Sequence, residues 1–148
     1  MVALRYLLDT NILSEPLKPA PNAGVLTNLK RLSERLATAA PVWHELTFGA
    51  ARLPVSERRA QIQEYLDTAI LGALPIIPYD ERAAAWHGRE RARLEALGKT
   101  PSFTDGQVAA VAAVNQLTLV TRNADDFRDF EGLRLENWFA GRKKVDRP

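Results

Sequence analysis

Short apolar runs alternate with helical patterns along this chain, and that alternation limits the possible folds more than any other feature. The predicted strands are residues 4–8, 37–40, 74–77, 117–120 and 133–135. Between them, apolar residues at helical spacing predict helices at residues 12–17, 22–36, 41–53, 55–71, 80–97 and 104–116. Strands that alternate with helices usually pair in parallel and carry helices on both faces. The sequence therefore predicts an α/β fold, a three-layer α/β/α sandwich around a mainly parallel central sheet.

The length and charge are those of one domain. The chain has 148 residues, and a chain of this size buries about two thirds of its unfolded surface, which is enough for one core. We assign residues 1–140 to a single domain and predict a flexible tail at residues 141–148, where four basic residues and one acidic residue lie. The rest of the chain is almost neutral, so overall charge does not indicate nucleic-acid binding.

Two absences exclude further classes of function. The chain has no cysteine, which excludes a thiol nucleophile and a cysteine-ligated metal site. Its apolar stretches fall short of the roughly 18 to 20 residues that span a bilayer. We therefore expect a cytoplasmic protein that does not contact a membrane.

Acidic and amide residues gather where the predicted strands end. Asp9 follows the first strand, and Glu45 lies about one turn into the helix after the second. Asp105 opens the helix before the fourth strand, and Asn123 and Asp126 follow that strand. In an open parallel sheet, ligands bind outside the carboxyl ends of the strands. We therefore expect these side chains to lie at one edge of the sheet.

Such a group of carboxylates predicts a bound cation. Several carboxylates in one cleft repel one another and take up protons unless a positive charge neutralises them. Oxygen ligands without cysteine or paired histidines select a hard ion, which predicts Mg²⁺, with Mn²⁺ as a substitute, and no other cofactor. Such an ion activates water and screens a phosphate, so the pattern indicates hydrolysis of a phosphodiester bond.

Each of these residues also has an ordinary structural interpretation. Asp9 can cap a helix that begins at Thr10, Glu45 can be solvated, and Asp105 can simply stabilise a helix N-terminus. For the segment with Asn123 and Asp126, capping is the favoured interpretation. The combined pattern, rather than any single residue, indicates a site.

In order and spacing, these residues resemble the PIN domain of the VapC/FitB-like toxins of bacterial toxin–antitoxin modules. The similar segments are LLDTNILSEPLKP (7–19), WHELTFGAARL (43–53), TDGQVAAVAAVNQLTLVTRNADDF (104–127) and GLRLENWF (132–139), which together span nearly the whole chain. The resemblance implies the PIN fold and a Mg²⁺-dependent endoribonuclease with tRNA or rRNA as its substrate. It also implies a homodimer that a cognate antitoxin peptide holds inactive.

The resemblance also assigns roles to individual residues. Asp9, Glu45 and Asp105 match the family's first three metal-binding acids. The fourth acid follows the Thr-Arg pair directly or stands in the next Asp-Phe pair. Here Asn123 occupies the first place, so Asp126 is the candidate and Asn123 a neutral helper. Many relatives have alanine or a larger residue at position 106, so Gly106 predicts a looser start of its helix.

The implied mechanism is in-line attack of water on phosphorus, which leaves a 5′-phosphate and a 3′-hydroxyl and does not need the 2′-hydroxyl. Asp9 and Asp105 would hold the ion directly, and Glu45 and Asp126 would act through water. Thr10, Asn11 and Thr121 are expected to hydrogen-bond the carboxylates or the phosphate, Arg122 to contact the RNA backbone, and Asn123 to support the site as a neutral helper. The basic residues of the helix at 80–97 can contact RNA, but a solvated face is the favoured interpretation.

Two other functions compete with a nuclease. In a HAD-like phosphotransferase Asp9 would be a nucleophile, but that chemistry needs a second acid where this chain has Asn11. In a non-catalytic PIN-fold binding module, the acids at positions 9, 45 and 105 would have no chemical role. The two histidines, His44 and His87, are interpreted as helix-surface or packing residues.

Overall fold

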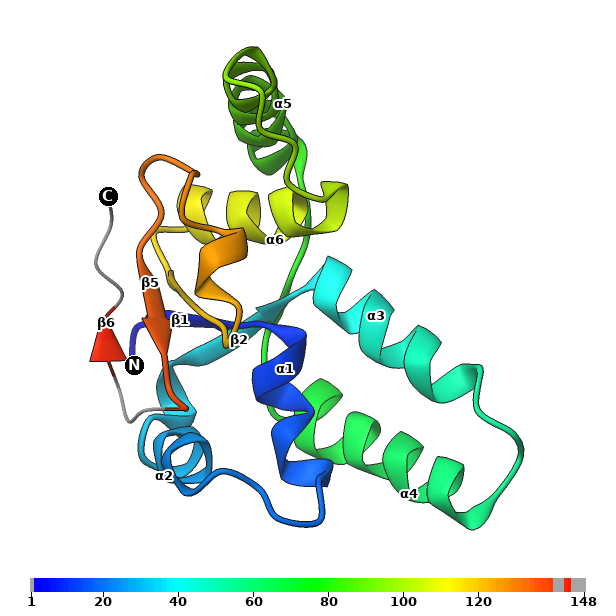
Figure 1. The fold of residues 1–148 in the computed structure, drawn as a ribbon. Helices are drawn as coiled ribbons and strands as arrows, with labels where there is room; N and C mark the ends of the chain where they lie inside the picture. The colour runs from blue at the N-terminus through cyan, green and yellow to red at the C-terminus, as the bar shows by residue number, and fades with distance from the viewer. Residues whose placement is uncertain (1, 140–142, 145–148) are drawn as a thin grey trace.

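The computed structural model describes residues 2–139 together with Lys143–Lys144, and Figure 1 shows their arrangement. Their strands form one sheet in the order β3-β2-β1-β4-β5-β6. The strands are β1 (Tyr6–Leu8), β2 (Leu36–Ala39), β3 (Ile76–Ile77), β4 (Thr118–Val120), β5 (Leu135–Asn137) and β6 (Lys143–Lys144). Strands β1 to β5 pair in parallel, and β6 is antiparallel to β5. The prediction of a mainly parallel central sheet is confirmed.

Helices cover both faces of this sheet, with α6 on one side and α2 on the other (Figure 1). The helical segments are α1 (Thr10–Leu13), η1 (Glu15–Leu17), α2 (Ala23–Arg31), η2 (Ser33–Arg35), α3 (Ala40–Ala51), α4 (Glu57–Tyr65), η3 (Leu66–Leu71), α5 (Glu81–Ala96), α6 (Phe103–Val114) and η4 (Ala124–Asp126). No helix in the described part of the chain is long and apolar enough to cross a membrane.

Helix α6 forms the centre of the core. It contacts β2 and β4 on one side and α5 on the other. Its residues Ala109, Ala110, Val111 and Ala112 are completely buried, as expected for a helix that is apolar all round. Small side chains let α6 lie close to the sheet, where Leu8 of β1 is also completely buried. This packing holds the N-terminus of α6 at the carboxyl edge of the sheet.

Several predicted boundaries are wrong because tertiary pairing overrides local pattern. The helix predicted at 22–36 ends at Arg31, since Leu36 pairs in register with Tyr6 and begins β2. The helix predicted at 55–71 consists of α4 followed by π-helical turns over Leu66–Leu71. The last predicted strand, 133–135, lies two residues too early relative to β5.

The tail at 141–148 lies mostly outside the described residues. Only Lys143–Lys144 are described there, and they form β6 against β5. The boundary at residue 140 and the flexibility of the tail stay predictions.

Candidate active site

Asp9 lies where the central strand β1 ends. Its backbone N–H donates to the carbonyl of Val120 at 3.0 Å, which continues the pairing of β1 with β4. The carboxylate Oδ1 accepts from the N–H of Thr10 at 2.8 Å, and Oδ2 accepts from the hydroxyl of Thr121 at 2.8 Å. Asp9 is therefore the N-cap of α1, which confirms its predicted capping role. Its carboxylate is also held in a fixed orientation at the carboxyl edge of the sheet.

A second layer of hydrogen bonds holds the partners of Asp9. Thr121 is completely buried, and its hydroxyl accepts from the Asn11 side-chain amide at 3.3 Å and from the Asn123 N–H at 3.1 Å. The Asn11 Oδ1 accepts from the Arg122 N–H at 3.0 Å. The Arg122 guanidinium lies over the ring of Phe139, 4.4 Å from its centroid. The residues predicted to support the carboxylates thus lock the segment after β4 to the segment after β1.

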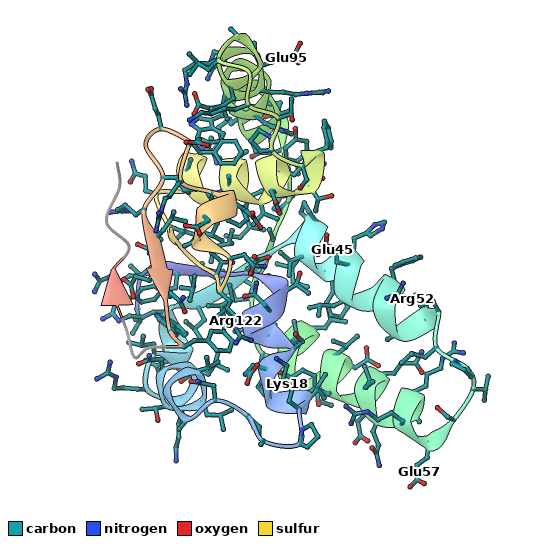
Figure 2. The ribbon with its side chains drawn as sticks, in the orientation of Figure 1. Lys18, Glu45, Arg52, Glu57, Glu95 and Arg122 are labelled. Atoms are coloured by element: carbon teal, nitrogen blue, oxygen red, sulfur yellow. The ribbon has the colours of Figure 1, made fainter. Side chains whose placement is uncertain are left out.

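Glu45 reaches the same edge from α3. Its Oε2 accepts from the Thr10 hydroxyl at 2.9 Å, so Thr10 contacts both Asp9 and Glu45. The Glu45 side chain is exposed near the start of α3, as Figure 2 shows. Thr10 therefore links an inner, half-buried carboxylate, through its backbone N–H, to an outer, exposed one, through its hydroxyl.

Asp105 and Asp126 complete the group. Asp105 is half-buried in the first turn of α6, where its N–H donates to the Ser102 hydroxyl at 3.1 Å. The N-cap of α6 is therefore Ser102, because the helix begins at Phe103, one residue before its predicted start. Asp126 is exposed in η4.

Burial and nearby carboxylate charges raise the pKa values of the two inner acids, Asp9 and Asp105. Burial raises the pKa of Asp9, hydrogen bonds from Thr121 and Thr10 lower it, and the charges of Glu45 and Asp126 raise it further. Burial likewise raises the pKa of Asp105, its hydrogen bond with Ser102 lowers it, and the charges of the other three acids raise it. The structure thus brings Asp9, Glu45, Asp105 and Asp126 to one edge of the sheet, where they repel one another.

The prediction that side chains of the segment after β4 cap a helix is wrong. Asn123 occupies the N-cap position of η4 but makes no side-chain capping bond. Asp125 points into solvent, with 84% of its side chain exposed, and pairs with Arg128 at 3.1 Å. Asp126 is consequently the acid of this segment that takes part in the electrostatics of Asp9 and Asp105.

The donor set fits a hard divalent ion that keeps part of its water. Within the described ranges, no three carboxylates or imidazoles converge closely enough to ligate one ion together. Mg²⁺ is usually held by one or two carboxylates and retains several waters. Two inner half-buried carboxylates, Asp9 and Asp105, with two outer exposed ones, Glu45 and Asp126, match that preference.

An imidazole packed on a glycine positions the helix that carries Asp105. His87 of α5 is buried, and a Cβ placed on Gly106 would lie 2.0 Å from its Nε2. The His87 Nδ1 shares a 2.9 Å hydrogen bond with the Tyr79 hydroxyl. The predicted loose start of α6 is therefore wrong, because the missing side chain at Gly106 is what lets α5 and α6 approach. The packing role expected of His87 is confirmed.

Gly106→Ala is expected to destabilise the protein by about 1–3 kcal/mol, because the added methyl group collides with the His87 ring. Gly88→Ala is the matched control, since Gly88 lies within α5 with open space around its Cα, and alanine should stabilise that helix by about 0.5–1 kcal/mol. Urea unfolding measures both variants. In a His87→Ala background the penalty of Gly106→Ala should disappear. Equal stabilisation by both alanines would contradict this packing.

A groove of about 580 Å³ opens beside Glu45 between α1, α3 and α4. Its lining includes the polar residues Thr10, Glu45, Arg52 and Thr104 and the apolar side chains Leu17, Leu46, Leu53, Ile62 and Leu66. The sequence pattern did not indicate this groove, because the residues that form it come from separate helices.

Comparison with known proteins adds to this geometry. Residues 6–133 match the family described as PIN domain. The toxin FitB of Neisseria gonorrhoeae is 36% identical over 124 residues, which cover 82% of this chain and 89% of FitB. VapC ribonuclease Y4jK of Sinorhizobium fredii is 32% identical over 134 residues, which cover 88% of this chain and 95% of that protein.

Solved structures show the same fold. VapBC2 from Rickettsia felis, crystallised with a DNA fragment from its promoter, superposes with a TM-score of 0.79 at 31% identity, covering 91% of this chain and 99% of that chain. VapBC-5 from Mycobacterium tuberculosis, a member of the VapBC family of toxin–antitoxin systems, gives a TM-score of 0.67 at 27% identity. That alignment covers 93% of this chain and 98% of the other.

Proposed function

This chain belongs to the PIN-domain family, and from that premise we propose that it is the ribonuclease toxin of a toxin–antitoxin module, dependent on Mg²⁺ or Mn²⁺. It is a nuclease that acts on the phosphodiester bonds of RNA. The observation that supports the metal dependence is that burial and neighbouring carboxylate charges raise the pKa values of Asp9 and Asp105 at the carboxyl edge of the sheet. A divalent ion relieves that repulsion.

Asp9 and Asp105 are the residues that would hold the ion, since each is half-buried; the Thr121 hydroxyl orients the Asp9 carboxylate, and the Asp105 backbone N–H is held by the Ser102 hydroxyl. When bound, the ion would lower the pKa of the attacking water and neutralise charge on the phosphate. Glu45 has its Oε2 engaged by Thr10, and its Oε1 is the oxygen that would orient the water. Asp126, exposed on the opposite segment, would act through solvent.

The rival functions gain no support. The acid that a HAD-like phosphotransferase needs two residues after Asp9 is here Asn11, whose amide is engaged by Thr121 and Arg122. A non-catalytic binding module does not explain why Thr121 and Thr10 orient carboxylates that repel one another.

We also propose that an antitoxin peptide occupies the groove beside Glu45. The groove combines apolar side chains with the charged side chains of Glu45 and Arg52, so an apolar segment that places a basic side chain beside Glu45 would fit it. A homodimer is proposed as well, because the α3–α4 pair projects from the body (Figure 1) and its connecting segment exposes 92% of Val55. Since RNA is the substrate, tRNA or rRNA being the proposed class, the cytoplasm is the proposed location.

Purified protein incubated with total RNA is expected to cleave it in Mg²⁺ and in Mn²⁺ and to leave it intact in EDTA. End mapping should find 5′-phosphate and 3′-hydroxyl ends, because water rather than the 2′-hydroxyl is the nucleophile. Cyclic phosphate ends, or cleavage that continues in EDTA, would contradict the proposed chemistry.

A further inference from the structure

Phe103 is an exposed aromatic residue next to the site. It is the first residue of α6, two positions before Asp105, and 53% of it is exposed although a phenyl ring gains by burial. The neighbouring Thr104 lines the groove beside Glu45. The N-terminus of α6 therefore presents Phe103 towards α5, Thr104 towards α3 and Asp105 towards Asp9.

Two side chains of α5 hold the Phe103 ring in place. The His87 imidazole lies 4.8 Å from it, centroid to centroid, and the Arg91 Cζ lies 5.4 Å from the ring centroid. His87 is itself fixed by Tyr79 and by its packing on Gly106. The ring is thus packed against His87, which belongs to the buried contact between α5 and α6, while Arg91 beside it is exposed.

A small pocket of about 110 Å³ adjoins the ring, lined by His87, Arg91, Glu95, Lys99, Thr100, Pro101 and Phe103. Lys99 is neutralised by Asp129 at 2.9 Å. Arg91 makes no ion pair with any residue that the structure describes, so its charge is available to an anion. Glu95 lies one turn further, at the outer end of α5 (Figure 2).

We propose that Phe103 and Arg91 form a nucleotide-binding subsite, in which an unpaired RNA base beside the cleaved phosphate stacks on the Phe103 ring while the adjoining phosphate lies near Arg91. This inference rests on the proposed function. An aromatic face binds any base by stacking, and arginine adds charge attraction to the backbone. Unpaired bases are the part of RNA that side chains reach most readily. The subsite would hold the strand so that the next phosphate lies over Asp105.

Binding of a fluorescein-labelled, unstructured RNA 12-mer, measured by anisotropy in an inactive Asp9→Asn background, tests the subsite. Phe103→Ala is expected to weaken binding by about tenfold to a hundredfold. Phe103→Leu keeps an apolar side chain without the π-face and should weaken binding nearly as much, whereas Phe103→Trp should restore it. A purely structural role for Phe103 would instead be rescued by leucine.

Matched controls come from the same two helices. Leu97→Ala removes a similarly exposed apolar side chain, 61% exposed, directly after α5, and should leave binding unchanged. Arg91→Ala should weaken binding and Arg89→Ala, on the opposite side of α5, should not. Against an oligomer of abasic nucleotides, the Phe103→Ala variant should bind as well as its Asp9→Asn parent, because there is no base to stack.

The outcomes separate the subsite from the proposed function. With Asp9 intact, the wild-type chain and the Phe103→Ala variant should have the same Mn²⁺ affinity by calorimetry. If the wild-type chain cleaves RNA but Phe103→Ala and Phe103→Leu bind it like the parent, the subsite is wrong and the nuclease assignment stands. If the wild-type chain neither binds nor cleaves RNA, the proposed function fails and the subsite with it.

Discussion

Replacing Asp9 with asparagine is expected to lower metal-dependent RNA cleavage by at least about a thousandfold. The substitution removes charge from a centre whose ion contributes several kcal/mol to catalysis, and roughly 1.4 kcal/mol corresponds to a tenfold change in rate. Asparagine has the size of aspartate and an oxygen that can still accept from the Thr10 N–H. Since burial and neighbouring charges oppose the ionised Asp9, the metal-free variant should melt at the wild-type temperature or above.

Asp125→Asn is the matched control for this loss. Asp125 lies next to Asp126 but points into solvent and pairs with Arg128, so the same change of charge should alter the cleavage rate by less than about twofold. Cleavage is measured on total RNA and melting by circular dichroism. An Asp9→Asn variant that cleaves at close to the wild-type rate, or whose activity is lost only because it unfolds, would contradict the role given to Asp9.

Divalent metal is expected to stabilise the fold, and to do so less as the pH falls. At a metal concentration about a hundred times the Kd, binding adds about 2.7 kcal/mol. For a chain of this size that is a rise in Tm of roughly 5 to 10 °C. The Asp9→Asn variant should show almost no rise. Thermal scans with Mn²⁺ and with EDTA across a pH series measure the difference.

The direction of this pH dependence follows from the raised pKa values of Asp9 and Asp105. In the metal-free protein these two carboxyls hold protons more tightly than in the unfolded chain, so their contribution to stability is present at low pH and is lost as the pH rises through the folded-state pKa values. Metal binds only the ionised carboxylates, so its contribution has the opposite dependence. The rise in Tm should therefore shrink as the pH falls towards these pKa values.

Other carboxyls also make the Tm depend on pH, so the quantity to compare is the difference in Tm between the Mn²⁺ scan and the EDTA scan. Hydrogen bonds and charges lower the pKa of Glu15, beside Lys18, and of Asp80, which caps α5. Their contributions are lost as the pH falls, with or without metal, so they cancel between the two scans. A Mn²⁺-dependent rise in Tm that stays constant down to the acid transition would contradict the assignment of Asp9 and Asp105 as ligands.

The positions of the acids could be predicted from sequence because strand ends are local features. Leu7 and Leu8 form an apolar run that stops at Asp9, and a parallel sheet places its carboxyl ends at one edge. Glu45 and Asp105 follow from the same rule, since each lies in the first turns of a helix at that edge. The contacts of Thr10 and Thr121 with these acids were also expected, whereas that of Ser102 with Asp105 was not.

The parts that escaped prediction depend on how helices cross. The contact of His87 with Gly106 arises from the packing of α5 on α6, and the pattern of either helix alone does not indicate that the two residues meet. Ser102 and Thr104 both suit an N-cap, and only the register of α6 decides for Ser102. A phenylalanine in sequence suggests the core, and the fold instead leaves Phe103 at the edge of the site.

Calorimetric titration with Mn²⁺ tests most directly whether Asp9, Glu45, Asp105 and Asp126 form one metal site. The wild-type chain and the Asp125→Asn control should bind Mn²⁺ alike, Asp9→Asn and Asp105→Asn should lose binding, and Glu45→Gln and Asp126→Asn should weaken it. Undiminished binding by Asp9→Asn and Asp105→Asn would show that the carboxylates at this edge do not hold the ion.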